Sequence, residues 1–311
     1  MAAAKVSAWY GHEPQGYQRF ADTFSAANTG AADAQSRLRA VADSSTQPPI
    51  ARATALAQLD ASTSQESLDA VTRGLRDSEG LVRLGALQAL TPAPLDIRIR
   101  LAAPLLSDPL KVLRTEAASL LAGSAAQLNA AERSAFERAA HEFVNDQQYN
   151  ADRPEARVNL GTFYANRADA TNAEEELKAA IRLDPFFAPA YVNLADLYRT
   201  SGRDAEGARM LEDGLKVSPR SGSLHHALGL ALIRTGRRSD ALAEFERATV
   251  LEPNNARFAY VYGVALHSMG RADDAIAWLQ KALVAHPGDA NMIAALTSFR
   301  DTTRSFGPVK K

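Results

Sequence analysis

The 311-residue sequence contains no cysteine. A chain without thiols cannot form a disulfide, a thiolate nucleophile, a cysteine-ligated zinc or iron–sulfur site, or the covalent C-x-x-C-H attachment of haem. The composition therefore implies no cofactor. It leaves the compartment open, because a thiol-free chain suits an oxidising periplasm and the cytosol equally well.

Net charge and long apolar runs are also nearly absent. Lys and Arg number 35 against 36 Asp and Glu, so no net field draws the chain to nucleic acid or to an anionic membrane. No segment approaches the roughly 20 apolar residues of a membrane span, and residues 1–5 are too short for a signal peptide. We expect a protein without a membrane span.

The sequence lacks the motifs of the common catalytic sites. It has no G-x-x-x-x-G-K, G-x-G-x-x-G or G-x-S-x-G. His141 and Glu142 begin an H-E-x-x-H pattern, but Asn145 stands in place of the second histidine. Two adjacent histidines, His225 and His226, point about 100° apart on a helix and cannot grip one metal together. We predict no catalytic residue, no metal site and no enzyme.

A 34-residue period marks the second half of the chain. Prolines stand at 185, 219, 253 and 287, which defines four repeats at 154–187, 188–221, 222–255 and 256–289. Each repeat has apolar and small residues at positions 7, 8 and 11, which share a helix side with position 4, and another set at 20, 24 and 27. Each set forms a stripe on one side of a helix, as an antiparallel helix pair requires.

These residues resemble the tetratricopeptide (TPR) family. The resemblance rests on N-L-G-x-x-Y at 159–164 and N-L-A-x-L-Y at 193–198, each followed by a small-x-x-x-large-x-x-small helix and a proline. It implies an all-α, right-handed helical-repeat solenoid. With the first half of the chain included, we predict about fifteen helices and no strand.

Turn and cap residues recur in the same register. Gly202, Gly236 and Gly270 suit left-handed turns between paired helices, where the first repeat has Ala168. We expect side-chain caps at the start of the following helices from Asp152, Ser221, Asn255 and Asp289. Residues 291–299 are interpreted as a C-terminal capping helix and 307–311 as a loose tail.

The first half has a 31-residue period. Arg52, Arg83 and Arg114 recur with an alanine three residues later, and the last two copies carry an aspartate six residues before the arginine, Asp77 and Asp108. D-x-x-x-x-V-R-x-x-A resembles the second helix of HEAT repeats. That resemblance implies that the aspartate and arginine link successive repeats. The first copy has Thr46 in place of the aspartate.

Helices flank this block. Residues 14–27 and 31–42 are predicted as two helices broken at Asn28-Thr29-Gly30. Asn129 and Glu132 form a capping box for a helix to about Val144, followed by a polar break at 145–153. We therefore predict two domains, 1–145 with the N-terminal helices and HEAT-like repeats, and 146–311 with four TPRs and the capping helix.

A wider resemblance covers nearly the whole chain. A-W-Y-G at 8–11, the HEAT-like stretch and the TPRs, in this order, are similar to the C-terminal scaffold region of bacterial multihaem c-type cytochromes. The resemblance implies a periplasmic setting and a c-type cytochrome module as a candidate partner. The haem function is not carried over, because the chain has no C-x-x-C-H.

The concave side of a TPR stack is lined by positions 2, 5, 9, 12 and 13 of the first helices. Here these positions are mixed in character, with an apolar patch in the third and fourth repeats and three arginines beside it. No lysine stands at positions 2 or 5, which argues against a TPR carboxylate clamp. The candidate partner-binding residues are Asp196, Arg199, His226, Leu230, Ile233, Arg234, Arg257, Tyr260, Val264 and His267.

We therefore expect a non-catalytic scaffold that binds a peptide or partner protein in the TPR groove. The bound segment is expected to be acidic and apolar. The alternative is an accessory, haem-free portion of a periplasmic cytochrome or redox complex. A docking role for Trp9, near the N-terminus, is a further hypothesis.

Overall fold

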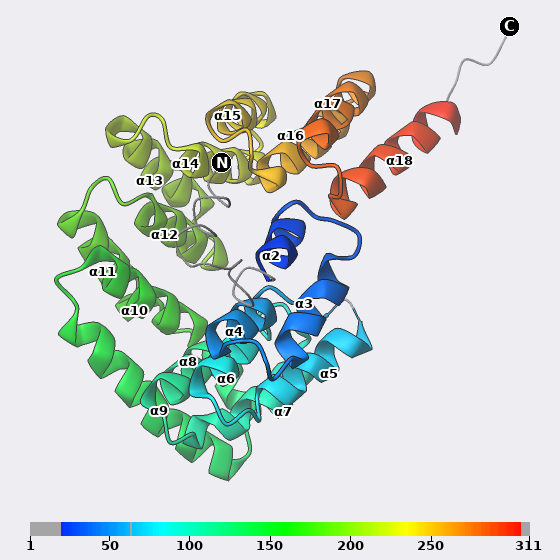
Figure 1. The fold of residues 1–311 in the computed structure, drawn as a ribbon. Helices are drawn as coiled ribbons and strands as arrows, with labels where there is room; N and C mark the ends of the chain where they lie inside the picture. The colour runs from blue at the N-terminus through cyan, green and yellow to red at the C-terminus, as the bar shows by residue number, and fades with distance from the viewer. Residues whose placement is uncertain (1–19, 63, 306–311) are drawn as a thin grey trace, which may run out of the picture. The chain divides into compact units, whose positions relative to one another are not determined.

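The computed structural model describes residues 20–62 and 64–305, and within these ranges it is all-helical. They form seventeen α-helices and two short 3-10 segments, with no strand (Figure 1). The predicted all-α fold is confirmed. The helices outnumber the predicted fifteen because many in the first half are only 8 to 11 residues long, and periodicity does not resolve such short elements. Residues 1–19, which include Trp9 and the start of the helix predicted at 14–27, lie outside the described residues, as does the tail.

The chain divides into two compact units, residues 1–145 and 146–311. Helix α9 (Ala130–Tyr149) crosses this division, and each unit is considered by itself below. The polar break predicted from 145 onward is wrong for its first residues, because the helix continues to Tyr149. No proline or glycine interrupts 145–149, and Asn145 bonds back to His141 within the helix.

Unit 1 is a series of short helices. They are α2 (Ala21–Asn28), α3 (Ala34–Asp43), α4 (Pro49–Ala57), α5 (Gln65–Gly74), α6 (Gly80–Gln88), α7 (Leu95–Ala102) and α8 (Lys111–Leu121), with 3-10 segments at Ala103–Ser107 and Ala122–Gln127. Helix α4 packs on α6, and α6 on α8. These three helices carry the three arginines of the 31-residue period.

The arginines link successive repeats of unit 1. Arg52 pairs with Asp77, and Arg83 pairs through two nitrogens with Asp108. Arg83 also donates to the backbone carbonyl of Asp77. The third arginine, Arg114, pairs with Glu142 of α9 and not with an aspartate. The first two pairs join one copy of the 31-residue pattern to the next, as the resemblance implied, and the third joins the last copy to α9.

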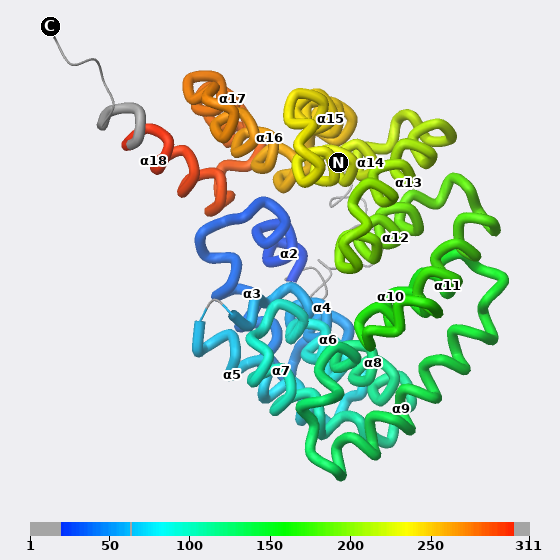
Figure 2. The backbone as a smooth tube through the Cα atoms, turned by 180° about the vertical axis from the view of Figure 1, so that it is seen from behind, coloured from blue at the N-terminus to red at the C-terminus, as the bar shows by residue number. Residues whose placement is uncertain are grey.

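Unit 2 is a run of helices that pack on their neighbours in chain order (Figure 2). The first helices of the four repeats are α10 (Pro154–Asn166), α12 (Ala188–Thr200), α14 (Gly222–Arg234) and α16 (Ala256–Ser268). The second helices are α11 (Ala170–Leu183), α13 (Asp204–Val217), α15 (Arg238–Leu251) and α17 (Ala272–Ala285), and α18 (Ala290–Ser305) follows them. Helix α18 buries Met292, Leu296 and Phe299 against the last repeat, as a capping helix does.

Small residues let the paired helices approach closely. A Cβ atom added to Gly229 would lie 2.5 Å from a ring carbon of Phe245, and one added to Gly263 would lie 2.6 Å from the side chain of Leu279. Both partners are buried. The small-against-large pattern of the sequence is therefore the packing of the two helices within a repeat.

The predicted turns between paired helices form, whereas one of the predicted helix caps does not. Gly202, Gly236 and Gly270 have φ of 70°, 81° and 77°, and Ala168 takes the same left-handed conformation at 60°. Side chains of Ser221, Asn255 and Asp289 accept from backbone N–H groups of the next helix. The cap predicted for Asp152 is wrong, because α10 begins one residue later with Arg153 at its N-cap and Pro154 in its first turn.

Candidate partner-binding groove

Two neighbouring hollows lie along the first helices of the repeats in unit 2. The first, of about 470 Å³, lies between α10 and α12 and is lined in part by Thr162, Asn193 and Asp196. The second, of about 320 Å³, is called here the His226 hollow and is lined by Val192, Ala195, Asp196, Leu211, Ser223, His226, Ala227, Leu230, Arg234, Arg257 and Phe258. Asp196 lines both, so the two hollows are neighbours on the same side of the first helices.

The predicted apolar patch lies partly within the core. Leu230, Ile233, Tyr260 and Val264 are half-buried and pack against the buried cluster of repeats 2 to 4. Of the four, only Leu230 lines the His226 hollow. The four side chains of the patch therefore pack against the core and also leave part of their surface exposed.

The three arginines beside this patch differ in their partners. Arg199 is bonded to Asp196 at 2.8 Å, and Arg234 to Asp204, at the start of α13, at 2.6 Å. Arg257 has no ion pair within the described residues. The sequence placed three arginines beside the patch, and Asp204 at the start of α13 neutralises one of them, Arg234. The unbalanced charge is that of Arg257.

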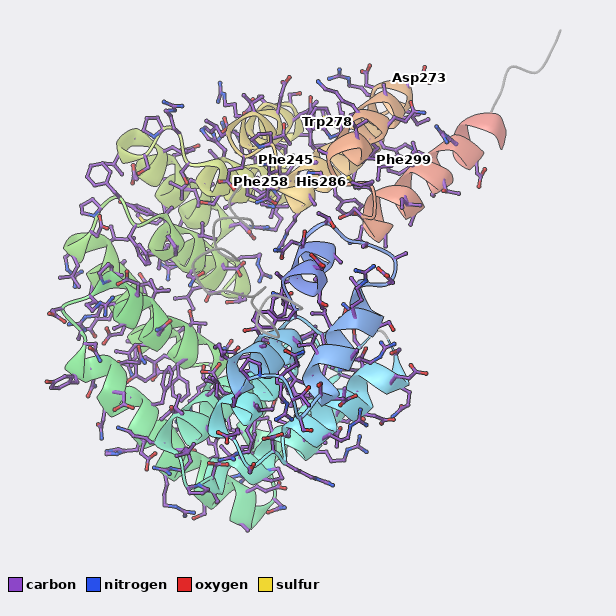
Figure 3. The ribbon with its side chains drawn as sticks, in the orientation of Figure 1. Phe245, Phe258, Asp273, Trp278, His286 and Phe299 are labelled. Carbon is purple, nitrogen blue, oxygen red and sulfur yellow. The ribbon has the colours of Figure 1, made fainter. Side chains whose placement is uncertain are left out.

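His226 is buried, which corrects its predicted place on an open inner face. Its side chain is 7% exposed, and its ring stacks on Phe258 with centroids 4.5 Å apart. Phe245 flanks the same ring at 5.7 Å, and both phenylalanines lie in the core between α14, α15 and α16 (Figure 3). Burial, and then the nearby charge of Arg257, lower the pKa of His226 from 6.5 to about 4. The ring is therefore neutral at pH 7.

The other histidines have structural partners. His225, at a predicted packing position, is buried and contacts Glu244 through Nδ1 and the carbonyl of Pro219 through Nε2. His267 stacks face to face on Phe299 of α18, with centroids 3.8 Å apart. His226 and His267 therefore stack on different aromatic partners. Among the described residues, no group of three His, Asp or Glu side chains could hold a metal ion.

Phe258 was not among the predicted groove residues, although it forms a wall of the His226 hollow. A signal for it was present in the sequence, because this third position of the repeat is Ala156, Ala190 and Leu224 in the preceding repeats. A ring there closes one side of the hollow and covers one face of His226.

In the part of the chain that is described, no helix is both long and apolar enough to cross a membrane.

Two family models match parts of the sequence. Residues 226–290 match the tetratricopeptide repeat model, and residues 115–254 match the bacterial transcriptional activator domain. A search of the curated proteins found no match.

Solved structures of TPR proteins are similar over about half of the chain. TTC0263, a thermophilic TPR protein of Thermus thermophilus, is 26% identical and covers 57% of this chain and 95% of its own, with a TM-score of 0.45. YrrB, described as a TPR protein with an unusual peptide-binding site, is 21% identical over 53% of this chain and 84% of its own, with a TM-score of 0.41. MamA from Desulfovibrio magneticus, from residue 41 onward, is 16% identical over 60% of this chain and 99% of its own, with a TM-score of 0.40.

The 34-residue spacing of the helix pairs and the family match at residues 226–290 both indicate TPR repeats in this part of unit 2. Residues 226–290 therefore carry the sequence pattern of TPR repeats, and the described residues of the chain are all-helical.

Proposed function

We propose that the chain is a scaffold whose TPR groove binds a segment of a partner protein. The observation that carries this proposal is the pair of neighbouring hollows along the first helices, which share Asp196. Together they offer a stretch with apolar walls and charged rims, the surface that an extended or helical segment can fill. A TPR-repeat fold is typical of a non-catalytic scaffold, and we assign the chain no reaction.

We further propose that unit 1 is a block of HEAT-like repeats and that the two units are separate domains. The Arg52–Asp77 and Arg83–Asp108 pairs support the first statement, since they join successive repeats as the resemblance implies. The alternative of a periplasmic, cytochrome-associated protein stays a prediction from sequence, and no match supports it.

The groove can be tested by selecting peptides from a displayed random library against the full chain. Selected peptides are then titrated against a variant that combines Tyr260→Ala with Arg234→Glu. Because Arg234 lines the His226 hollow and the half-buried Tyr260 leaves part of its side chain exposed, we expect binding to weaken by roughly 2 kcal/mol or more.

Two measurements keep this test specific. Circular dichroism must show that the double variant is folded, since Tyr260 is half-buried and Arg234 pairs with Asp204. Arg238→Glu, an exposed change at the start of α15 outside both hollows, serves as the charge control. If selected peptides bind the folded double variant as tightly as the unaltered chain, the groove is not the binding surface.

A further inference from the structure

A row of exposed apolar side chains recurs in unit 1 with the 31-residue period. Ile50, Leu81 and Val112 each stand two residues before one of the periodic arginines, near the start of α4, α6 and α8. Their exposed fractions are 58%, 42% and 51%. A single exposed leucine or valine is ordinary. These three, however, occupy equivalent places on helices that pack in order, so they line up across the unit (Figure 1).

Leu110 makes the row continuous between α6 and α8. Its side chain fills the space that a Cβ of Gly80 would take, over the first turn of α6 and beside Leu81, and it is 45% exposed. The side chains of Ile50, Leu81, Leu110 and Val112 are called here the apolar strip. Because packed helices lie 8–10 Å apart, the strip extends for roughly 20 Å. A partner segment of about six extended or thirteen helical residues would cover it.

One carboxylate on the same side of α8 has no counter-ion. Glu116 follows Val112 by one helical turn and is the equivalent of Gly85, which faces the backbone of Ala53 on α4. Glu116 therefore stands on the side of α8 toward α6, where it is half-buried. Within residues 20–62 and 64–305 no cation pairs with it, and burial raises its pKa with no opposing charge. A cation supplied by a partner would remove the cost of this unpaired charge.

The other charges near the strip are balanced. The three periodic arginines are each paired with a carboxylate of their own. Glu79 and Lys111, which adjoin the strip in sequence and are both exposed, offset each other. The charge of Glu116 is therefore the one left unbalanced among these groups. An occupant of the strip that complements it is cationic as well as apolar.

We propose that the apolar strip and Glu116 form a second docking surface, for a partner segment that carries a lysine or arginine beside apolar residues. The apolar side chains of the segment cover Ile50, Leu81 and Val112, and its cation pairs with Glu116. This surface lies in unit 1 and does not depend on the proposed groove of unit 2. Its cationic ligand also differs from the acidic segment expected in that groove.

The library selection against the full chain also tests this surface. The methyl groups of Ile50, Leu81 and Val112 report binding directly when the chain is labelled at isoleucine, leucine and valine methyls for NMR. We expect one class of selected peptides to shift these three resonances to saturation. The members of this class should carry lysine or arginine next to apolar residues.

A charge variant assigns the role of Glu116. Glu116→Gln keeps the shape of the side chain and removes an unpaired charge, so its melting temperature should not fall. It should bind the strip peptides about tenfold more weakly. Replacing the basic residue of the peptide by glutamine should weaken binding equally on the unaltered chain and little on Glu116→Gln, because the two charges act as a pair. Asp96→Asn, an exposed change on α7, which carries no residue of the strip, is the charge control and should bind unchanged.

The proposal is overturned if no selected peptide shifts the strip resonances, if the peptides that shift them lack a basic residue, or if Glu116→Gln binds them unchanged. Failure of this surface and failure of the groove are distinguishable. Peptides that lose binding in the Tyr260→Ala and Arg234→Glu double variant without shifting the strip support the groove and remove this surface. Peptides that shift the strip and bind that double variant normally support this surface alone.

Discussion

Unit 1 and unit 2 are both helical repeats, but different interactions join their repeats. In unit 1 two of the three linking ion pairs, Arg52–Asp77 and Arg83–Asp108, are sequestered, and the side chains of the second are only 13% and 7% exposed. Unit 2 also has ion pairs between repeats, yet these lie nearer to solvent, as Arg237 and Glu212 show at 53% and 39%. Within a single repeat of unit 2 the paired helices make close apolar contacts, such as that of Gly229 with Phe245.

This difference predicts which kinds of substitution destabilise each unit. A sequestered ion pair stabilises little relative to a well-packed apolar pair, but removing one partner leaves a buried charge uncompensated. An exposed pair contributes less and can be removed at small cost. A glycine against a ring tolerates no added volume. Unit 1 should therefore be sensitive to the loss of a charge. Both units should be sensitive to an added side chain where helices meet at a glycine, since a Cβ at Gly85 of unit 1 would lie 2.2 Å from the carbonyl oxygen of Ala53.

The largest effect is expected for Gly229→Leu in unit 2. Even a Cβ at this position would lie within 3 Å of three ring atoms of the buried Phe245, so α14 and α15 must separate. We expect the free energy of unfolding to fall by about 3 kcal/mol or more. Thermal melting and hydrogen exchange measure the change, with Ala243→Leu on the exposed side of α15 as the control. A melting temperature within a degree of the original would show that this face is not packed.

A somewhat smaller effect is expected for Arg83→Met in unit 1. The substitution keeps most of the side-chain volume but leaves Asp108 buried without its cation. We expect a loss of about 2 kcal/mol. Arg73→Met is the matched control, because the Arg73–Asp43 pair is 59% and 43% exposed and should contribute less than about 0.5 kcal/mol. Equal losses in chemical denaturation for the two variants would contradict the role of sequestration.

Acid should weaken unit 2 before unit 1. The folded pKa of His226 is about 4, against 6.5 for an ordinary histidine. Between these values the unfolded chain binds a proton that the folded chain does not, so stability falls as the pH is lowered from 6.5 toward 4. We expect unit 2 to lose on the order of 1–2 kcal/mol by pH 5, and His226→Phe to abolish that loss.

Carboxylates set the response of both units at lower pH. Burial alone would raise the pKa of Asp77 in unit 1, but its hydrogen bonds from Glu79 and Arg52 lower it overall. Its contribution is therefore present above pH 3.8 and is lost only below that value. Hydrogen exchange resolved by segment at pH 7 and pH 5 tests this order. Equal weakening of the two units, or an unchanged loss in His226→Phe, would refute it.

The smallest effect concerns the first TPR turn. Ala168 has φ of 60°, whereas the equivalent residues in the other three repeats are glycines. A side chain in the left-handed region is strained, and Ala168→Gly relieves that strain at some cost in unfolded-chain entropy. We expect a net gain of about 0.5 kcal/mol in urea denaturation. A loss of similar size would show that the alanine is not strained in this turn.

Much of the fold could be predicted from the sequence because residues that recur at a fixed spacing occupy equivalent places in each helix pair. The 34-residue spacing of proline, glycine and small residues defined the helix pairs of unit 2, and the Asn129–Glu132 capping box forms as predicted. In unit 1 the resemblance to HEAT repeats implied that Asp77 and Asp108 link successive copies through the arginines. The end of α9 was not, because residues 145–149 are polar without being helix breakers.

The candidate site was predicted less well, since its chemistry depends on contacts between repeats. Position in the repeat placed His226 and Arg234 on the inner side of a helix, but not the neighbours that they meet there. Only the tertiary structure showed that Asp204 neutralises Arg234, that Phe258 buries His226, and that Arg257 has no ion pair in the described residues. The sequence by itself determined which face each residue takes, because that follows from helical periodicity. Burial and pairing were decided by the packing of one repeat on the next, which brings together side chains about 30 residues apart in the chain.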